Sequence, residues 1–141
     1  MKLGRTLLVT LAVLAGAAVP AAACSCARPS ASSVWENAAA VFTGVARGTR
    51  PLGNGRSVTT FEVTEDFKGA DYGASVTVEH PTGPSASCGI QFALGATHTL
   101  SAYTREGALS SNLCSVAMFG DGKLLEELRQ LRDGETENED Q

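Results

Sequence analysis

Four cysteines are the residues of this chain best suited to chemistry, and two of them, Cys24 and Cys26, are separated by a single residue. The other two, Cys88 and Cys114, lie far along the sequence. An even number of cysteines in a short exported chain is typical of disulfides rather than free thiols. Four cysteines allow three pairings, and a Cys24–Cys26 bond would close a very small ring with poor geometry. Two pairings remain open, and each crosslinks the segment 24–26 to both distant cysteines.

The residues before Cys24 have the features of a secretory signal peptide over 1–23. The segment has a basic start and an apolar stretch over 7–19, and Ala21 and Ala23 supply the small residues that a signal peptidase needs. The apolar stretch is too short to favour a retained membrane span. We therefore expect a secreted, extracellular protein whose first mature residue is Cys24, with its α-amino group held in place by the crosslinks.

Lipid attachment at Cys24 is a competing interpretation, because it also needs a cysteine at the cleavage point. The three residues before Cys24 are alanines and lack the leucine that usually precedes a lipidated cysteine. A thioether at this sulfur would also leave one odd thiol among the other cysteines. Secretion is therefore the main prediction, and a membrane-anchored lipoprotein is the alternative.

The charge of the chain argues against nucleic acid and anionic lipid as partners. The 141 residues have a formal net charge of −4 at pH 7. Acidic residues crowd the segment 133–141, so the rest of the mature chain is close to neutral. Without a basic field, the protein has little to attract polyanions. We expect a protein partner, a monomer, and no cofactor.

Strand patterns dominate the middle of the chain. The clearest strand is 58–68, in which Phe61, Val63, Glu65 and Phe67 share one face and polar residues share the other. Further strands are predicted at 41–47, 76–78, 97–104 and 107–113, with loops rich in Gly, Pro and Ser between them. Short strands at this spacing predict an all-β domain, either a small barrel or a sandwich.

Two helices are expected to flank these strands. Ser33 and Glu36 fit a capping box at the start of a short helix. Near the other end, leucines line one face of a helix predicted over 121–132. The acidic segment 133–141 is poor in apolar residues, which predicts a disordered tail. The sequence thus predicts a single folded domain over 24–132.

Short motifs along the mature chain follow one another in a distinctive order. They are Cys24-Ser25-Cys26, Val41-Phe42-Thr43-Gly44-Val45, Phe61-Glu62-Val63, Phe67-Lys68-Gly69, Cys88-Gly89 with Phe92 and Gly95, and Leu113-Cys114. In order and spacing they resemble the netrin-like module family, and within it the N-terminal domain of the tissue inhibitors of metalloproteinases. The resemblance implies a five-stranded OB-fold (Greek-key) barrel with short flanking helices and a disulfide-stapled N-terminal arm. It also implies the pairing Cys24–Cys88 and Cys26–Cys114.

In the inhibitors that the chain resembles, the first mature residue chelates the catalytic zinc of the target protease. Carried over to this sequence, the amino group and carbonyl oxygen of Cys24 bind that zinc, and the side chain of Ser25 enters the pocket beside it. The resemblance therefore implies a metalloprotease inhibitor. Other netrin-like modules bind proteins without inhibiting proteases, so a non-inhibitory extracellular interaction module is the alternative.

The remaining polar residues give no comparable signal. His80 and His98 lack the spacing of metal ligands relative to each other and to the cysteines. The serines near position 25 have no nucleophile motif around them. The carboxylates of the strand 58–68 fall mostly on its polar face, which disfavours a paired acid and base. The sequence therefore predicts no enzyme activity.

Overall fold

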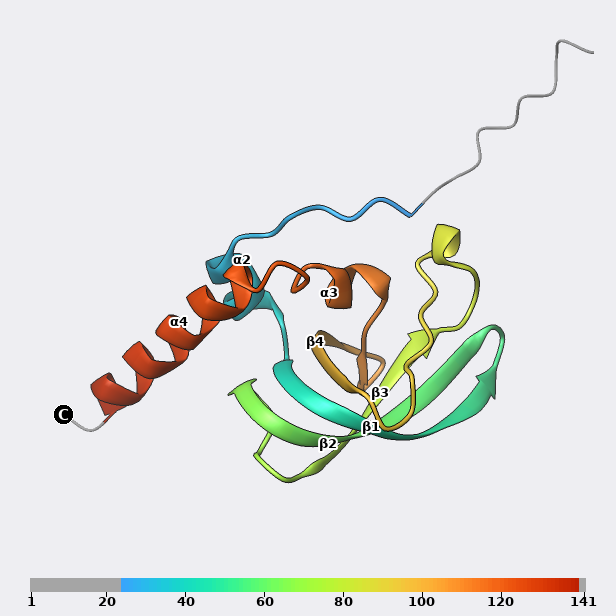
Figure 1. Cartoon of the computed structure of the whole chain (residues 1–141), viewed down its shortest axis with the longest axis horizontal. Helices are drawn as coiled ribbons and strands as arrows, with labels where there is room; N and C mark the ends of the chain where they lie inside the picture. Colours follow the sequence, from blue (N-terminus) through green and yellow to red (C-terminus); the bar gives the residue numbers. More distant parts are fainter. Residues whose placement is uncertain (1–23, 140–141) are drawn as a thin grey trace, which may run out of the picture.

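A computed structural model describes residues 24–139, and the predicted signal peptide over 1–23 lies outside this part. The elements, in chain order, are α2 (Ala31–Asn37), β1 (Ala40–Gly53), β2 (Arg56–Lys68), β3 (Ser75–Pro81), the 3-10 helix η1 (Ser85–Ser87), β4 (Thr97–Arg105), β5 (Ala108–Ser110), α3 (Leu113–Ala117) and α4 (Lys123–Glu139). The strands form one sheet that closes into a barrel in the order β1-β2-β3-β5-β4 (Figure 1). The prediction of a small all-β domain with flanking helices is confirmed, and of the two predicted architectures the chain adopts the barrel.

Bent strands close the sheet. β1 pairs antiparallel with β2 on one side and with β4 on the other. The register of β1 and β2 shifts at several points, one of them between Thr43 and Gly44, and such bulges increase the bend and twist of a strand. Glycine fits this bend because a Cβ at Gly44 would lie 2.9 Å from the carbonyl oxygen of Glu62. β5 completes the ring by pairing antiparallel with β4 and, through Glu79 and Ser110, parallel with β3.

Nearly all of the buried apolar side chains belong to one of two cores. The core of the barrel consists of Ala40, Phe42, Ala46, Phe61, Val63, Ala70, Val78, Phe92, Leu100 and Ala102. The second core joins the helices to the barrel and consists of Ala31, Val34, Ala38, Val41, Phe67, Phe119, Leu124 and Leu128. Successive residues of a strand point to opposite faces, so Val41 and Phe42 supply different cores. The two helices α2 and α4 therefore cover the barrel without filling it.

The predicted inward face of β2 is confirmed for its aromatic residues, because both Phe61 and Phe67 are buried. Glu65 lies between them in sequence and is half-buried near α4. Arg129 of α4 donates two hydrogen bonds to its carboxylate, at 2.9 and 3.0 Å, and these hold the pKa of Glu65 below its usual value. The guanidinium groups of Arg129 and Arg132 each lie 5.5 Å from the centre of the Phe67 ring. α4 thus covers the end of β2 and pairs the half-buried carboxylate of Glu65 with arginines.

The N-cap of the first helix lies three residues before the predicted one. The side chain of Ser30, and not that of Ser33, is the N-cap, and its oxygen accepts a hydrogen bond from the backbone N–H of Ser33 at 3.2 Å. Starting the helix at Ala31 brings Ala31 and Val34, one turn apart, into the second core. Ser30 and Ser33 are equally suited to capping. The burial of Ala31 and Val34 favours the helix that begins after Ser30.

The prediction of a disordered tail from Asp133 is wrong for the part that the structure describes, because α4 continues to Glu139. The leucine-anchored start of α4 provides the nucleus, and each added residue then extends an existing helix. The indole N–H of Trp35 donates a hydrogen bond to Glu135 at 2.8 Å and ties the extension to α2. Residues 140–141 lie outside the described part. The composition of the segment 133–141 does not reveal this helical extension, because Trp35, to which Glu135 is bonded, lies 100 residues away in the sequence.

Candidate functional site

The N-terminal arm, residues 24–30, has no regular secondary structure and is crosslinked to the barrel by two disulfides. Cys24 is bonded to Cys88 with a Cα–Cα distance of 5.2 Å, and Cys26 is bonded to Cys114 with a distance of 5.1 Å. This is the pairing that the resemblance implies. From the crosslinks the arm runs past α3 toward α2 (Figure 1). Since the two bonds flank a single residue, the segment is fixed on both sides of Ser25.

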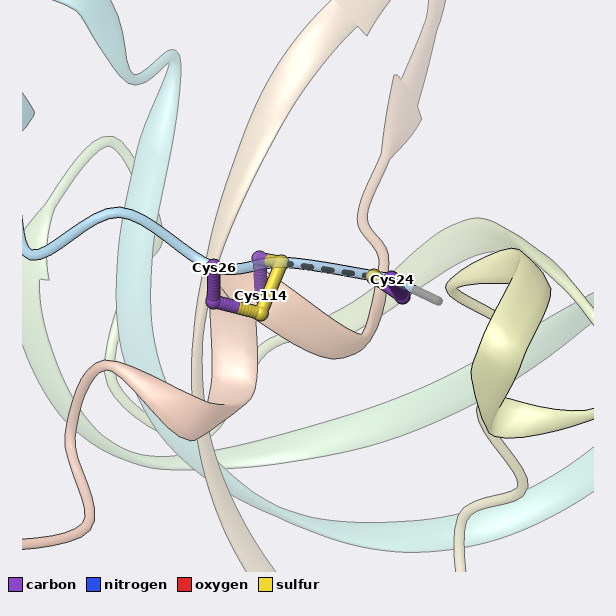
Figure 2. A group of neighbouring side chains, drawn as sticks. All are labelled: Cys24, Cys26 and Cys114. Atoms are coloured by element: carbon purple, nitrogen blue, oxygen red, sulfur yellow. Dashed lines mark hydrogen bonds between the residues drawn. A yellow bond between two sulfur atoms is a disulfide. The ribbon is translucent and has the colours of Figure 1, made fainter. Parts of the chain in front are cut away.

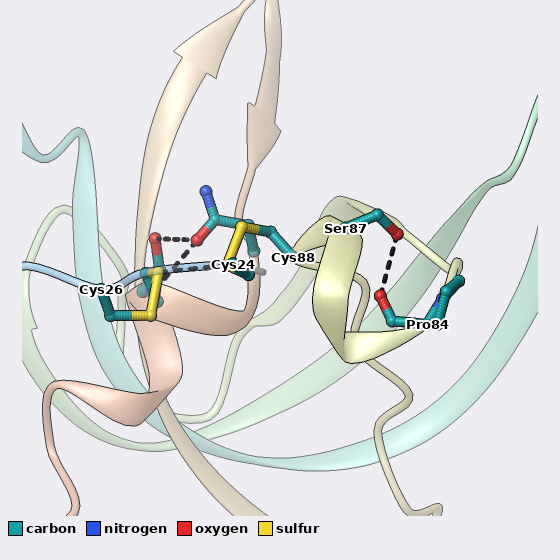
Figure 3. The surroundings of a disulfide bond; sticks show 8 residues. Cys24, Cys26, Pro84, Ser87 and Cys88 are labelled. Atoms are coloured by element: carbon teal, nitrogen blue, oxygen red, sulfur yellow. Dashed lines mark hydrogen bonds between the residues drawn. A yellow bond between two sulfur atoms is a disulfide. The ribbon is translucent and has the colours of Figure 1, made fainter. Parts of the chain in front are cut away.

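The first anchor, Cys88, lies on a tight loop after η1. Its φ of 61° is in the left-handed region, which non-glycine residues adopt at some cost. The hydroxyl of Ser87 donates a hydrogen bond to the carbonyl oxygen of Pro84 at 2.8 Å and closes the loop (Figure 3). A Cβ at Gly89 would overlap the carbonyl oxygen of Gly83. The Cys-Gly pair in the sequence therefore reflects a backbone crossing at which no side chain fits.

The second anchor, Cys114, lies on the short helix α3. The side chain of Asn112 caps this helix by accepting a hydrogen bond from the backbone N–H of Ser115 at 3.1 Å. The backbone N–H of Leu113 donates to the carbonyl oxygen of Cys88, also at 3.1 Å. The two barrel-side cysteines are therefore positioned relative to each other by backbone contacts, independently of their bonds to the arm.

Three of the four sulfur atoms of the two disulfides lie close together (Figure 2). The Sγ atoms of Cys24, Cys26 and Cys114 all lie within 4.8 Å of one another. Cys24 Sγ and Cys114 Sγ, which belong to different disulfides, are 3.7 Å apart. Neither sulfur carries a proton in the oxidised protein, so this is a van der Waals contact between the two bridges and not a hydrogen bond.

The two predicted contact residues differ in exposure. Ser25 is exposed, and Cys24 is half-buried. In an extended segment neighbouring side chains point to opposite sides, so bonding Cys24 and Cys26 to the barrel turns Ser25 away from it. Ser25 is therefore presented to solvent beside the backbone of Cys24.

A groove of about 500 Å³ lies beside the arm. One wall is the arm, from Cys26 to Pro29, and the other is the connection between α3 and α4 together with the start of α4. Arg28 and Asp121 face each other across it at 3.6 Å, and both side chains are exposed. Sequence reasoning missed this groove, because the turn that builds its second wall carries no motif.

The two histidines belong to an aromatic cluster and lie apart from the arm. The rings of His80 and His98 meet Phe92 edge to face, at 5.0 and 5.1 Å between ring centres. His80 is buried, and hydrogen bonds to Thr59 and to the carbonyl oxygen of Ile90 satisfy both of its ring nitrogens. Burial lowers the pKa of His80 from its ordinary value of 6.5. Its partners are therefore structural groups of the barrel.

The described residues thus form a small closed β-barrel whose N-terminal arm is crosslinked at Cys24 and Cys26. The chain matches no protein-family model, and no curated protein matches it. Among the helices of residues 24–139, none combines the length and the apolar character required to cross a bilayer. The geometry of the arm is therefore the principal guide to function.

Proposed function

We propose that this protein is a secreted inhibitor of zinc metalloproteases, similar in mode to the tissue inhibitors of metalloproteinases. In this proposal the amino group and carbonyl oxygen of Cys24 chelate the zinc of the target enzyme, and Ser25 enters the adjoining pocket. The observation that carries the proposal is the double crosslink, which fixes the backbone on both sides of an exposed Ser25.

The chemistry of the arm suits such a target. A catalytic zinc keeps one coordination position open for water or substrate. An α-amino nitrogen and the carbonyl oxygen of the same residue close a five-membered ring with a metal and displace that water. The α-amino group has a pKa near 8, so losing its proton to bind zinc at neutral pH costs little. A segment that is already fixed loses less conformational entropy on binding.

We also propose that the barrel is of the OB type, as in the netrin-like modules. The strand order β1-β2-β3-β5-β4, with β1 next to β4, supports this assignment. The long antiparallel pairing of β1 with β2 supports it as well. In this arrangement the disulfides attach the arm to the loop after β3 and to the helix after β5.

Secretion with an unmodified Cys24 is part of the proposal. Its sulfur is bonded to Cys88, and a sulfur engaged in a disulfide cannot also form a thioether to lipid. Both disulfides are in keeping with an oxidising compartment. These bonds favour the secreted form over the lipoprotein.

The test compares two forms of the mature protein against a panel of zinc proteases. One form begins at Cys24, and the other carries one extra alanine before it, which converts the amine into an amide. Intact mass and circular dichroism check that both forms contain two disulfides and the same fold. We expect the extension to weaken inhibition by at least about 100-fold, equivalent to about 2.7 kcal/mol.

A second, chemical modification serves as the matched control. Cyanate at mildly acidic pH carbamylates the α-amino group before the lysines, because its pKa is about two units lower. The carbamylated protein should match the alanine-extended form. Equal inhibition by the free and blocked proteins would refute chelation, and inhibition by neither would favour the non-inhibitory interaction module.

A further inference from the structure

The cysteine cluster carries an inference that is separate from protease inhibition. Three sulfurs, from Cys24, Cys26 and Cys114, lie within 4.8 Å of one another (Figure 2). Cys24 and Cys26 are separated by a single residue, so the two bridges that they form are close neighbours. The fourth sulfur, of Cys88, adjoins this group through its bond to Cys24.

The spacing matches that of a metal held by thiolates. In a tetrahedral site with Zn–S bonds of about 2.3 Å, neighbouring sulfurs are about 3.8 Å apart. The contact between Cys24 Sγ and Cys114 Sγ, at 3.7 Å, already has this length. We propose that the reduced protein binds one soft divalent ion, such as Zn²⁺, through the thiolates of Cys24, Cys26, Cys88 and Cys114.

The conversion balances with water as the only further reactant. A thiol or phosphine reductant supplies two electrons to each disulfide, each S–S bond breaks, and four thiols result. A thiol reductant gives up its own protons and becomes a disulfide, whereas a phosphine becomes its oxide, with the oxygen and the thiol protons coming from water. Binding of the ion then releases the four thiol protons and leaves a site with a charge of −2. Because protons compete with the ion for sulfur, affinity rises with pH.

The support for two of the ligands does not depend on the disulfides. The hydrogen bond from Leu113 to Cys88 and the Asn112 cap of α3 involve backbone and amide groups that reduction leaves intact. The ligands from the arm, Cys24 and Cys26, are two positions apart, so in an extended segment both face the barrel. Cys26 is exposed, which gives an ion access from solvent.

The redox state decides which form exists. In an oxidising compartment the cysteines remain paired, whereas the newly made chain in a reducing compartment has four thiols. The ion would then hold the arm against the barrel before oxidation. This site uses the side-chain sulfurs of the chain itself, whereas the proposed inhibition uses the backbone of Cys24 toward a zinc of the target. The two proposals therefore fail independently.

The test is a titration of the purified protein, reduced by a phosphine without oxygen, with Co²⁺ as a spectroscopic probe. We expect one equivalent to bind and to give the sulfur-to-cobalt charge-transfer and visible bands of a tetrahedral thiolate site. One equivalent of Zn²⁺ should displace it. Each single Cys→Ser replacement should weaken binding by more than the roughly 10- to 100-fold that loss of an outer-shell partner costs. The matched control, Ser25→Ala, should bind as the parent does.

Several results would overturn the proposal. The oxidised protein must not bind the probe, and the affinity in concentrated urea must be lower than in native buffer, since the folded barrel gathers the ligands. Equal affinity in urea, or a cobalt spectrum with fewer than four sulfur ligands, refutes a site built by the fold. If the reduced chain unfolds without metal, circular dichroism must show that Zn²⁺ restores the barrel. Binding without refolding also counts against the proposal.

Discussion

The hydroxyl group of Thr59 donates a hydrogen bond to Nε2 of His80 inside the barrel wall, at 2.8 Å. The direction of this hydrogen bond is set by the other ring nitrogen, Nδ1, which lies 3.1 Å from the carbonyl oxygen of Ile90. A carbonyl oxygen can only accept, so Nδ1 carries the proton of the neutral ring and Nε2 is the acceptor. The hydroxyl of Thr49, 2.7 Å from that of Thr59, continues the chain of hydrogen bonds. The cross-strand contact thus suits a neutral His80.

We predict that stability falls as the pH is lowered below 6.5. Burial lowers the pKa of His80 in the folded protein, so the unfolded chain takes up its proton at higher pH than the folded chain does. The contribution of the neutral ring is complete above 6.5 and is lost as the pH falls toward the lowered pKa. Urea denaturation from pH 7 to about 5.5, where ordinary carboxyl groups stay ionised, measures the effect.

Replacements at the two histidines identify the group responsible. His80→Gln should remove most of this pH dependence, whereas His98→Gln, at the neighbouring ring of the aromatic cluster, should leave it in place. If the pH dependence of the free energy of unfolding persists in His80→Gln and disappears in His98→Gln, His80 is not the group responsible.

The two disulfides should contribute almost equally to stability. They join residues 64 and 88 positions apart, and loop-closure entropy depends on the logarithm of this separation. Replacing either pair by serine should lower the free energy of unfolding by about 4 kcal/mol. Urea denaturation of the two double variants tests the prediction. A difference of more than about 2 kcal/mol between them would show that strain or contacts, and not loop closure, dominate.

Gly89→Ala should damage the arm indirectly. The new Cβ would overlap the carbonyl oxygen of Gly83, and relief requires a backbone shift next to Cys88. Forcing atoms into a filled site costs about 1–3 kcal/mol. The control is Gly48→Ala in β1, where a Cβ has no heavy atom within 4 Å. Thermal unfolding of both variants tests this prediction. Equal stability of the two would show that the loop around Gly89 accommodates the added Cβ without cost.

The sequence predicts the barrel well because strand alternation is a local property. Residues of β2 on the predicted face, such as Phe61 and Val63, are buried as expected. The last strand is shorter than predicted, since β5 ends at Ser110 and the following residues lead to the Asn112 cap of α3. The cap and the short helix depend on three or four residues. The strand pattern over 107–113 includes the capping residue Asn112, so the sequence predicts a strand there.

The site is predicted less completely than the barrel. Residue spacing excludes a bond between Cys24 and Cys26 but leaves two pairings, and the family resemblance was needed to choose between them. The contacts that position Cys88 and Cys114, such as the hydrogen bond from Leu113 to Cys88, join distant segments. Such contacts leave no periodic signal, so the gathering of the Cys24, Cys26 and Cys114 sulfurs is visible only in three dimensions.

The helical extension of α4 can be followed through Trp35, the single tryptophan of the chain. Its indole N–H donates to Glu135 at 2.8 Å, and Lys68 lies 5.9 Å from the ring centre. Glu135→Ala should shift the tryptophan emission and lower the free energy of unfolding by about 1 kcal/mol, the usual net value of a hydrogen bond. Glu137→Ala is the control, two residues further along α4. Identical emission from both variants would indicate that α4 does not reach Trp35.

Ser25 should control which protease is inhibited without affecting stability. The residue is exposed, so Ser25→Val should change the free energy of unfolding by no more than about 0.5 kcal/mol. In the proposed complex its side chain enters the enzyme's pocket, where one methyl group is worth about 1–3 kcal/mol, or roughly 10- to 200-fold in affinity. The inhibition constants should therefore change by different factors across a panel of zinc proteases. The control, Ala27→Val, is also exposed and lies beyond the second crosslink, so it should leave the ranking of targets unchanged. The same shift from both variants would mean that Ser25 does not enter the pocket.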